Sequence, residues 1–358
     1  MTDKATKERI GWLDAVRVLA ISCVLLTHAI SYAGVMDKDP TTFMWTVYLV
    51  LRFIAITGVP LFLMLSGYLC IGKKLTASYY AGIIPVVLSY LVITAISIAA
   101  AHFSGEASFT VFKAILGTLN FTAHGYAWYV EMYIGLFLLI PFLNILWNAL
   151  GTRKRKLALI GVLALMTVLP STVPSFHLFG TKLDVLPDYW TDIYPLTFYF
   201  IGAYLKEYPI RLTAWQKAVF AVAATALPVT LCLVKTRMDG EYAWYMMNGF
   251  SSVTVALTGI AYFTALSDVK MPRAVSFAMK HISLCSFEMY LFSYVTDHIM
   301  QKLIADIGMT HDSVIILVSF VGSFVMAFAA SFILRLALVP LAEAIMNIFL
   351  QKKEKTPA

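Results

Sequence analysis

Three ionisable residues in the first apolar segment have the types and spacing needed for chemistry. Arg17 and His28 are eleven residues apart, and at about 100° per residue eleven helical steps fall close to three full turns. Both side chains therefore lie on one face of a helix, about 16 Å apart along its axis. Asp14 precedes Arg17 by three residues, which is the spacing of side chains that pair on the same helix.

These residue types favour group transfer from an anionic donor. The pKa of an unperturbed histidine is near neutral, so a deep His28 can take a proton from a hydroxyl. An arginine nearer the helix start can hold phosphate by paired hydrogen bonds. Snorkelling to the headgroups is the simpler interpretation of Asp14 and Arg17, and a satisfied core histidine that of His28. The alignment of the three residues and the depth of His28 favour the functional interpretation. Arg17 and His28 could line a tunnel with an anionic cofactor at its mouth and the reacting atom deeper in. Acyl-coenzyme A, with a phosphorylated head and a long thin arm, fits this arrangement.

The composition places these residues in a membrane protein. Hydrophobic residues make up 60% of the 358 and charged residues only 13%, against about 25% charged residues in soluble domains. The basic residues are dispersed between apolar runs, which excludes the basic stripe of a nucleic-acid-binding protein. The four cysteines lie singly in apolar segments, without the spacing of a metal site, and no metal is expected.

Apolar runs of about 17 to 25 residues predict an all-α, polytopic integral membrane protein with about ten transmembrane helices. A further short helix is expected over 109–121, and 174–190 is expected to be a long external loop. Residues 1–10 and 341–358 are predicted to flank one membrane domain, 11–340. The expected spans are 11–33, 45–71, 79–101, 127–149, 157–173, 191–206, 213–234, 244–267, 282–300 and 313–340.

The basic residues predict the orientation of these spans. Eighteen of the 27 Lys and Arg residues fall at the termini and in the loops on the same side, six fall in the opposite loops, and three fall inside spans. Because cytoplasmic loops are enriched in Lys and Arg, both termini are predicted to be cytoplasmic. An even number of spans agrees with this distribution.

Four sequence blocks resemble the membrane acyltransferase-3 family, whose members O-acetylate surface polysaccharides, peptidoglycan or related acceptors. The first holds Arg17, ten intervening residues and His28. The other three resemble the family's second-helix motif, its tryptophan-led block and its late serine-tyrosine block. In chain order the blocks read WLDAVRVLAISCVLLTHA, GVPLFLMLSGYL (58–69), AWYVEMYIGLFLLIPFL (127–143) and HISLCSFEMYL (281–291).

The resemblance implies that Arg17 and His28 are essential, with His28 the general base or proton carrier. Motif positions of this family match Ser66, Gly67, Trp128 and Tyr290. The chain is expected to be of the type without the extracytoplasmic serine-hydrolase domain that some relatives append.

The sequence departs from this family at two positions. Many relatives have a glutamate at the position of Tyr133 and a histidine at the position of Ser293. These departures leave the partners of His28 open.

Other polar residues inside the predicted spans are weighed individually, because such residues usually have a partner or face water. Arg52 lies deep in a span and is a candidate cofactor or acceptor contact. Glu131 is either a functional contact or a structural ion-pair partner, with Arg52 as one possibility. Glu288 is interpreted as structural and Arg335 as snorkelling to the headgroups.

Three further residues receive a mainly structural interpretation. Ser66 is a candidate substrate contact through the resemblance, although a small residue in a span more often allows close packing. His298, next to Asp297 near an external helix end, could orient the acceptor, but the two are interpreted first as a surface pair.

The sequence therefore predicts an O-acyltransferase, and more narrowly an O-acetyltransferase, of the bacterial plasma membrane. The donor is expected to be acetyl-CoA or another acyl-CoA from the cytoplasm. The acceptor is expected to be a hydroxyl of a cell-surface glycan or of its lipid-linked precursor, and membrane lipids surround the chain. A proton-coupled secondary transporter or flippase is the alternative, although the two halves show no convincing internal repeat.

Overall fold

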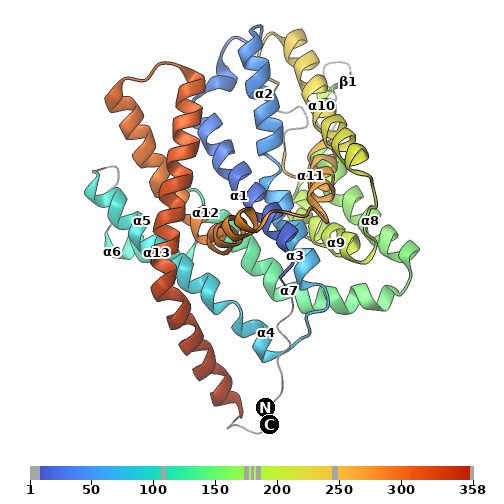
Figure 1. Cartoon of the computed structure of the whole chain (residues 1–358), viewed down its shortest axis with the longest axis vertical. Helices are drawn as coiled ribbons and strands as arrows, with labels where there is room; N and C mark the ends of the chain where they lie inside the picture. The colour runs from blue at the N-terminus through green and yellow to red at the C-terminus, as the bar shows by residue number, and fades with distance from the viewer. Residues whose placement is uncertain are drawn as a thin grey trace.

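The computed structural model describes residues 9–105, 110–172, 177–178, 181–182, 187–243 and 249–354. These residues form an all-α bundle, and the strands among them are a two-residue antiparallel pair, β1 (His177–Leu178) and β2 (Thr181–Lys182). Figure 1 shows most of the helices standing side by side in one body. The predicted fold class, an all-α polytopic membrane protein, is confirmed. Most of the expected external loop 174–190 lies outside the described residues.

Seven helical stretches in the described chain are long and apolar enough to cross a membrane. Two of them are interrupted: α2 and α3 share one stretch, and α4 and α5 share another. The stretches comprise α1 (Gly11–Tyr32), α2 (Phe43–Ala55) with α3 (Gly58–Cys70), α4 (Ala77–Ala81) with α5 (Ile84–Phe103), α7 (Trp128–Leu150), α8 (Arg153–Thr172), α10 (Ala214–Asp239) and α13 (Asp312–Glu354).

The other three expected spans form helices of a different kind. Two are only fourteen residues long, α9 (Tyr194–Glu207) and α11 (Val253–Leu266). The third, α12 (Arg273–Ile307), is 35 residues long and includes Lys280, Glu288 and Asp297. Short elements complete the described chain: η1 (Val35–Asp37), α6 (Val111–Leu119) and η3 (Asp188–Ile193).

Helix α1 lies inside the bundle, where it packs against α2, α3, α11, α12 and α13. The apolar residues on its inner faces are buried, among them Val16, Ile21 and Leu25. Figure 1 shows α1, in blue, between α13 and α2 in the view. A helix in this position can present polar groups to its neighbours and not to lipid.

Two glycines allow α3 and α9 to pack backbone against backbone. A Cβ at Gly67 in α3 would fall on the carbonyl oxygen of Tyr199 in α9, and a Cβ at Gly202 would fall on that of Met64. The two backbones therefore touch, as small residues in membrane helices allow. The packing interpretation of the Ser66-Gly67 pair agrees with this contact.

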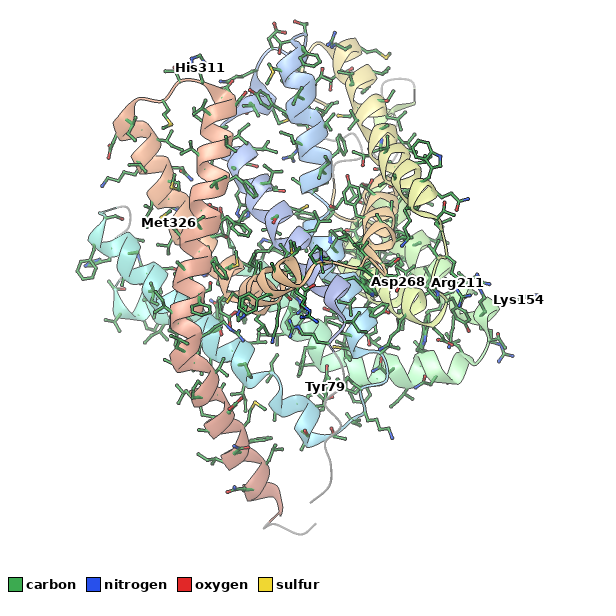
Figure 2. All side chains as sticks on the ribbon, in the orientation of Figure 1. Tyr79, Lys154, Arg211, Asp268, His311 and Met326 are labelled. Carbon is green, nitrogen blue, oxygen red and sulfur yellow. The ribbon has the colours of Figure 1, made fainter. Side chains whose placement is uncertain are left out.

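Helix α13 is 43 residues long, which corresponds to about 64 Å, roughly twice the thickness of the hydrocarbon core. Figure 1 shows its red C-terminal part projecting beyond the other helices. Residues 341–354, expected as part of a separate tail, continue this helix. At the opposite end the Lys38 ammonium contacts Asp312 at 2.5 Å and ties the segment after α1 to the start of α13. Figure 2 places His311 at that end, away from Tyr79.

Candidate active site

Helices α1 and α12 run side by side in the same direction. Asp14 on α1 bonds Ser283 on α12, and His28 bonds Asp297. Fourteen residues, about 21 Å of helix, separate the two contacts on each helix. Ser283, Tyr290 and Asp297 follow one another at intervals of seven residues, so they lie along one face of α12. This face of α12 lines the polar face of α1 from end to end.

Asp297 holds His28 in a defined tautomer. The Nδ1 of His28 lies 3.0 Å from Oδ2 of Asp297, and the side chain of Asp297 is only 4% exposed. A carboxylate can only accept hydrogen bonds, so Nδ1 donates the proton. Nε2 is then left with a lone pair that can accept a proton from a substrate. A histidine oriented by a carboxylate in this way is the arrangement of a general base.

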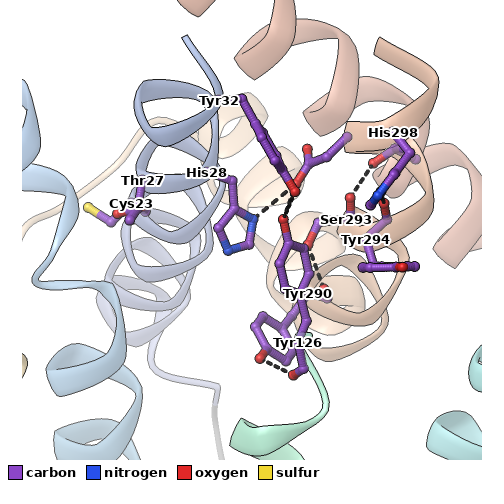
Figure 3. Close-up of polar contacts among 11 residues, drawn as sticks. Cys23, Thr27, His28, Tyr32, Tyr126, Tyr290, Ser293, Tyr294 and His298 are labelled. Carbon is purple, nitrogen blue, oxygen red and sulfur yellow. Dashed lines mark hydrogen bonds and ion pairs between the residues drawn. The ribbon is translucent and has the colours of Figure 1, made fainter. Parts of the chain in front are cut away.

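Two tyrosines complete the surroundings of His28. The ring of Tyr126 stacks on the imidazole with centroids 4.1 Å apart, and its hydroxyl donates to Oδ2 of Asp297 at 3.1 Å. The hydroxyls of Tyr32 and Tyr126 lie 2.5 Å apart. Figure 3 shows His28, Tyr32 and Tyr126 meeting at one point between α1 and α12. This aromatic cluster fixes the plane of the imidazole.

The segment before α7 positions Tyr126. His124 in this segment is buried, and its Nε2 lies 3.3 Å from the hydroxyl of Thr94. Its ring also packs against Tyr294 of α12, with centroids 5.0 Å apart. Burial lowers the pKa of His124 to about 4, so this imidazole is neutral at pH 7 and serves as packing.

A cavity of about 310 Å³ lies between this cluster and the Arg17 end of α1. Its walls come from α1, α3, α5, α7, α12 and α13, and most of the lining is apolar, with a few polar groups that converge on the space. This is the usual form of a small-molecule site. The lining reaches Val24, one helical turn before His28, and Tyr290. The cavity therefore ends next to the His28 cluster.

Arg17 lies on the lining of this cavity. Its Nη1 donates to the hydroxyl of Ser283 at 3.2 Å, and that hydroxyl donates to Asp14 at 2.7 Å. Asp14 in turn accepts two bonds from Arg9, at 2.8 and 2.6 Å. The expected side-chain pair of Asp14 and Arg17 is thus bridged by Ser283, because Arg17 is directed toward the cavity and α12 supplies the partner.

Of the other candidate site residues, Ser66 and Tyr290 also line the cavity. The hydroxyl of Ser66 donates to the Phe62 carbonyl at 3.0 Å. The hydroxyl of Tyr290 donates to the carbonyl oxygen of Tyr126. Tyr290 therefore links the end of the cavity to the residue that stacks on His28.

Three candidates lie away from the cavity lining in the described chain. The Nε of Arg52 donates to the hydroxyl of Tyr242 at 3.0 Å inside a separate buried cluster. Trp128 stacks on Phe250 with centroids 5.7 Å apart. The side chain of Glu131 is exposed. These positions connect none of the three to His28 directly.

The two departures from the family pattern have different surroundings. Tyr133 lines the cavity together with Arg17. Ser293 is fully buried, and its hydroxyl donates to the backbone carbonyl of Tyr290 at 2.7 Å. Tyr133 is therefore placed to meet a ligand, whereas Ser293 supports the helix.

Sequence reasoning missed Asp297 and Tyr126. The interpretation of Asp297 as part of a surface pair with His298 is wrong, since Asp297 is buried. The seven-residue spacing of Ser283, Tyr290 and Asp297 was the available signal for Asp297. Nothing in the sequence indicated that Tyr126 would stack on His28.

Glu288 and Arg335 were interpreted separately, yet they form a pair. Nη1 of Arg335 lies 2.8 Å from Oε1 of Glu288, and both residues line the cavity. Within the described chain, no group of three His, Cys, Asp or Glu side chains is arranged to hold a metal ion.

A family profile described as an acyltransferase domain matches residues 10–336, which cover most of the chain and the whole cavity. The chain belongs to this acyltransferase family. No curated protein and no solved structure matches it. As an acyltransferase, an enzyme that transfers groups other than aminoacyl groups, it requires a donor site and a base within reach of each other. The cavity and the His28 cluster are the parts of the structure that fit these two needs.

Proposed function

We propose that this acyltransferase moves an acetyl group from cytoplasmic acetyl-CoA to a hydroxyl of a cell-surface glycan or of its lipid-linked precursor. The observation that supports this most directly is the arrangement of α1, with Arg17 on a cavity of about 310 Å³ and His28 held by Asp297 just beyond its end. The enzyme would act in the bacterial plasma membrane, with both termini in the cytoplasm.

Acyl-CoA suits the inner part of the site. Guanidinium groups bind phosphate through paired, charge-assisted hydrogen bonds, and Arg17 offers one such group on the cavity wall. The remaining lining is mostly apolar, with the hydroxyls of Ser66, Tyr133 and Ser286 interspersed. A thin pantetheine arm with two amide groups fits a lining of this kind. The donor would thus approach with its phosphates at Arg17 and its thioester toward His28.

The choice of acetyl as the transferred group rests on the resemblance to a family whose members O-acetylate their acceptors. Tyr126 covers one face of the imidazole, and the hydroxyl of Tyr32 lies next to that of Tyr126.

The proposed reaction is a proton-coupled transfer at His28. Nε2 removes the proton from the acceptor hydroxyl, and the oxygen of that hydroxyl forms a bond to the thioester carbon. The carbon–sulfur bond then breaks, and the departing coenzyme A thiolate takes the proton from the imidazolium. Asp297 stabilises the imidazolium in between, since its carboxylate remains negatively charged. A transient acyl-histidine is the alternative route through the same atoms.

The function can be tested on the purified protein in lipid nanodiscs. Wild-type protein is expected to release coenzyme A from acetyl-CoA in the presence of an acceptor glycan. His28→Ala is expected to lose this activity by at least about 100-fold, because general-base catalysis contributes about 10² to 10⁴, while its melting temperature stays close to that of the wild type. Exchange of a solute across vesicles without any thioester turnover would instead favour the transporter alternative.

The acceptor needs a separate measurement in cells. Mass spectrometry of surface polymers from a strain lacking this protein should show the loss of an acetyl ester. Restoration by the wild-type gene but not by His28→Ala would connect the ester to this site. Surface polymers with unchanged ester content would contradict the proposed acceptor class.

A further inference from the structure

The cavity has a second guanidinium group. Arg335 reaches its wall from α13, whereas Arg17 reaches it from α1. Arg335 is 26% exposed although its partner Glu288 is only 6% exposed. The side chain of Arg335 is therefore less enclosed than that of the glutamate that anchors it.

The contact between Arg335 and Glu288 uses only part of each group. Nη1 of Arg335 donates to Oε1 of Glu288, and the hydroxyl of Ser89 donates to the same oxygen at 3.1 Å. Oε2 is buried and has no hydrogen-bond partner among the described residues. A purely structural pair would gain most from two parallel bonds between the guanidinium and both carboxylate oxygens. The observed single contact holds Arg335 in place and leaves its other N–H groups for a further partner.

The anchor points of the two arginines are five residues apart on α12. Arg17 bonds Ser283 and Arg335 bonds Glu288, about 7.5 Å apart along the helix and about 140° around it, so the two arginines reach the same cavity from different sides. Two lysines add positive charge near Arg17. Lys73 and Lys206, like Arg17, lie near enough to Cys70 on the cavity lining to interact with it electrostatically. Together these groups favour an anion with more than one phosphate.

We infer that Arg335, positioned by Glu288, is a second phosphate-binding residue that holds the diphosphate of the donor together with Arg17. This inference rests on the proposed function, since it specifies how that site recognises its donor. Arg335 would form a charge-assisted hydrogen bond to a diphosphate oxygen through a nitrogen not used by Glu288. Glu288 would act only by orienting the guanidinium.

The test compares two acetyl donors with the same thioester. Acetyl-CoA has the diphosphate and nucleotide, whereas S-acetyl-pantetheine lacks both. Arg335→Gln is expected to raise the KM for acetyl-CoA about 10- to 100-fold, the usual effect of losing a hydrogen bond to a charged group. Its kcat/KM for S-acetyl-pantetheine should stay within about twofold of wild type, because this donor has no phosphate for Arg335 to bind.

Controls separate recognition from folding. Arg153→Gln removes the same charge at an exposed site on α8 that is off the cavity, and should leave both donors unaffected. Arg335→Lys retains the charge for Glu288 but not the planar fork, and should show an intermediate rise in KM for acetyl-CoA alone. It also provides a readout if Arg335→Gln fails to fold.

Two results would overturn the inference. One is an equal loss of activity with both donors in Arg335→Gln and Arg335→Lys, which indicates a structural ion pair. The other is a folded Arg335→Gln variant with wild-type KM for acetyl-CoA. Failure of the proposed function is distinguishable, since wild-type protein would then neither turn over acetyl-CoA nor bind coenzyme A in a calorimetric titration.

Discussion

At the scale of single residues, Asp297 determines what His28 can do. Without an oriented partner, an imidazole in an apolar setting exchanges its proton between both nitrogens and turns about its side-chain bonds. The carboxylate 3.0 Å away fixes the proton on Nδ1, and the stacked Tyr126 fixes the ring plane. Nε2 is thereby prepared as a proton acceptor before the substrate arrives, which is the geometric requirement for general-base catalysis.

The variant Asp297→Asn should separate this orientation from the binding of substrate. An amide can donate to Nδ1 and so shift the imidazole proton to Nε2, and it lacks the charge that stabilises an imidazolium. We expect kcat to fall about 10²- to 10⁴-fold with the KM for the donor within about threefold of wild type.

The control for this prediction is the next residue in the chain. His298 points its Nδ1 at the backbone carbonyl of Tyr294, at 2.6 Å, and His298→Ala should retain most of the activity. Steady-state kinetics of both variants, with melting temperatures measured in parallel, provide the check. Wild-type kcat in a folded Asp297→Asn protein would show that His28 acts without this carboxylate.

At the scale of elements, the site depends on close packing around α1 and α3. A Cβ at Gly58 would lie 2.8 Å from the carbonyl oxygen of Ala20, so α3 begins directly against α1. Further along, Gly67 brings α3 against the backbone of α9. Since α3 also contributes Ser66 and Cys70 to the cavity wall, the position of this wall depends on the glycine contacts.

The variant Gly67→Ala is therefore expected to destabilise the protein. The added methyl group would meet backbone atoms of Tyr199 and Ala203, which cannot turn aside as a flexible side chain can. Overpacking typically costs about 1 to 3 kcal/mol, and we expect a loss at the upper end of this range, measured as a lower melting temperature in detergent.

Gly135→Ala is the matched control. This glycine is also inside a helix, α7, but a Cβ there would meet open space. Its melting temperature should equal or exceed that of the wild type, because alanine has the higher helix propensity. Equal stability of the Gly67 and Gly135 variants would mean that α3 and α9 can separate without cost.

At the scale of the whole molecule, orientation in the membrane determines which substrate reaches which end of the site. Arg17 lies nearer the start of α1, and His28 lies near its far end. With a cytoplasmic N-terminus, the cavity would face the compartment that contains acyl-CoA, and His28 would lie toward the side where surface glycans are assembled. The parallel course of α1 and α12 agrees with their predicted places as the first and ninth spans, which would cross in the same direction.

Cysteine labelling in intact cells can test this orientation. Thr310→Cys, in the turn between α12 and α13, should react with a membrane-impermeant maleimide, whereas Thr152→Cys, between α7 and α8, should react only after lysis. Both positions are exposed. The native cysteines are buried or only partly exposed, so wild-type protein serves as the background. The reverse labelling pattern would place Arg17 on the outer side and contradict a cytoplasmic acyl-CoA donor.

The sequence by itself determined the class of the protein and the polar face of α1. Apolar run length and charge distribution follow directly from the cost of exposing polar groups to lipid, and the 3.6-residue helical repeat aligns Arg17 with His28. Run length alone predicted full-length spans at 191–206 and 244–267, where α9 and α11 are only fourteen residues long. Helices buried inside a bundle need not be long enough to cross a bilayer.

Tertiary structure alone decided the partners of this face. Asp297 is distant from His28 in the chain, and only the parallel register of α1 and α12 brings them within 3.0 Å. Arg335 meets Glu288 for the same reason, through the packing of α13 on α12. Local sequence sets which way a side chain faces on its own helix, whereas the neighbour it meets depends on how distant helices pack together.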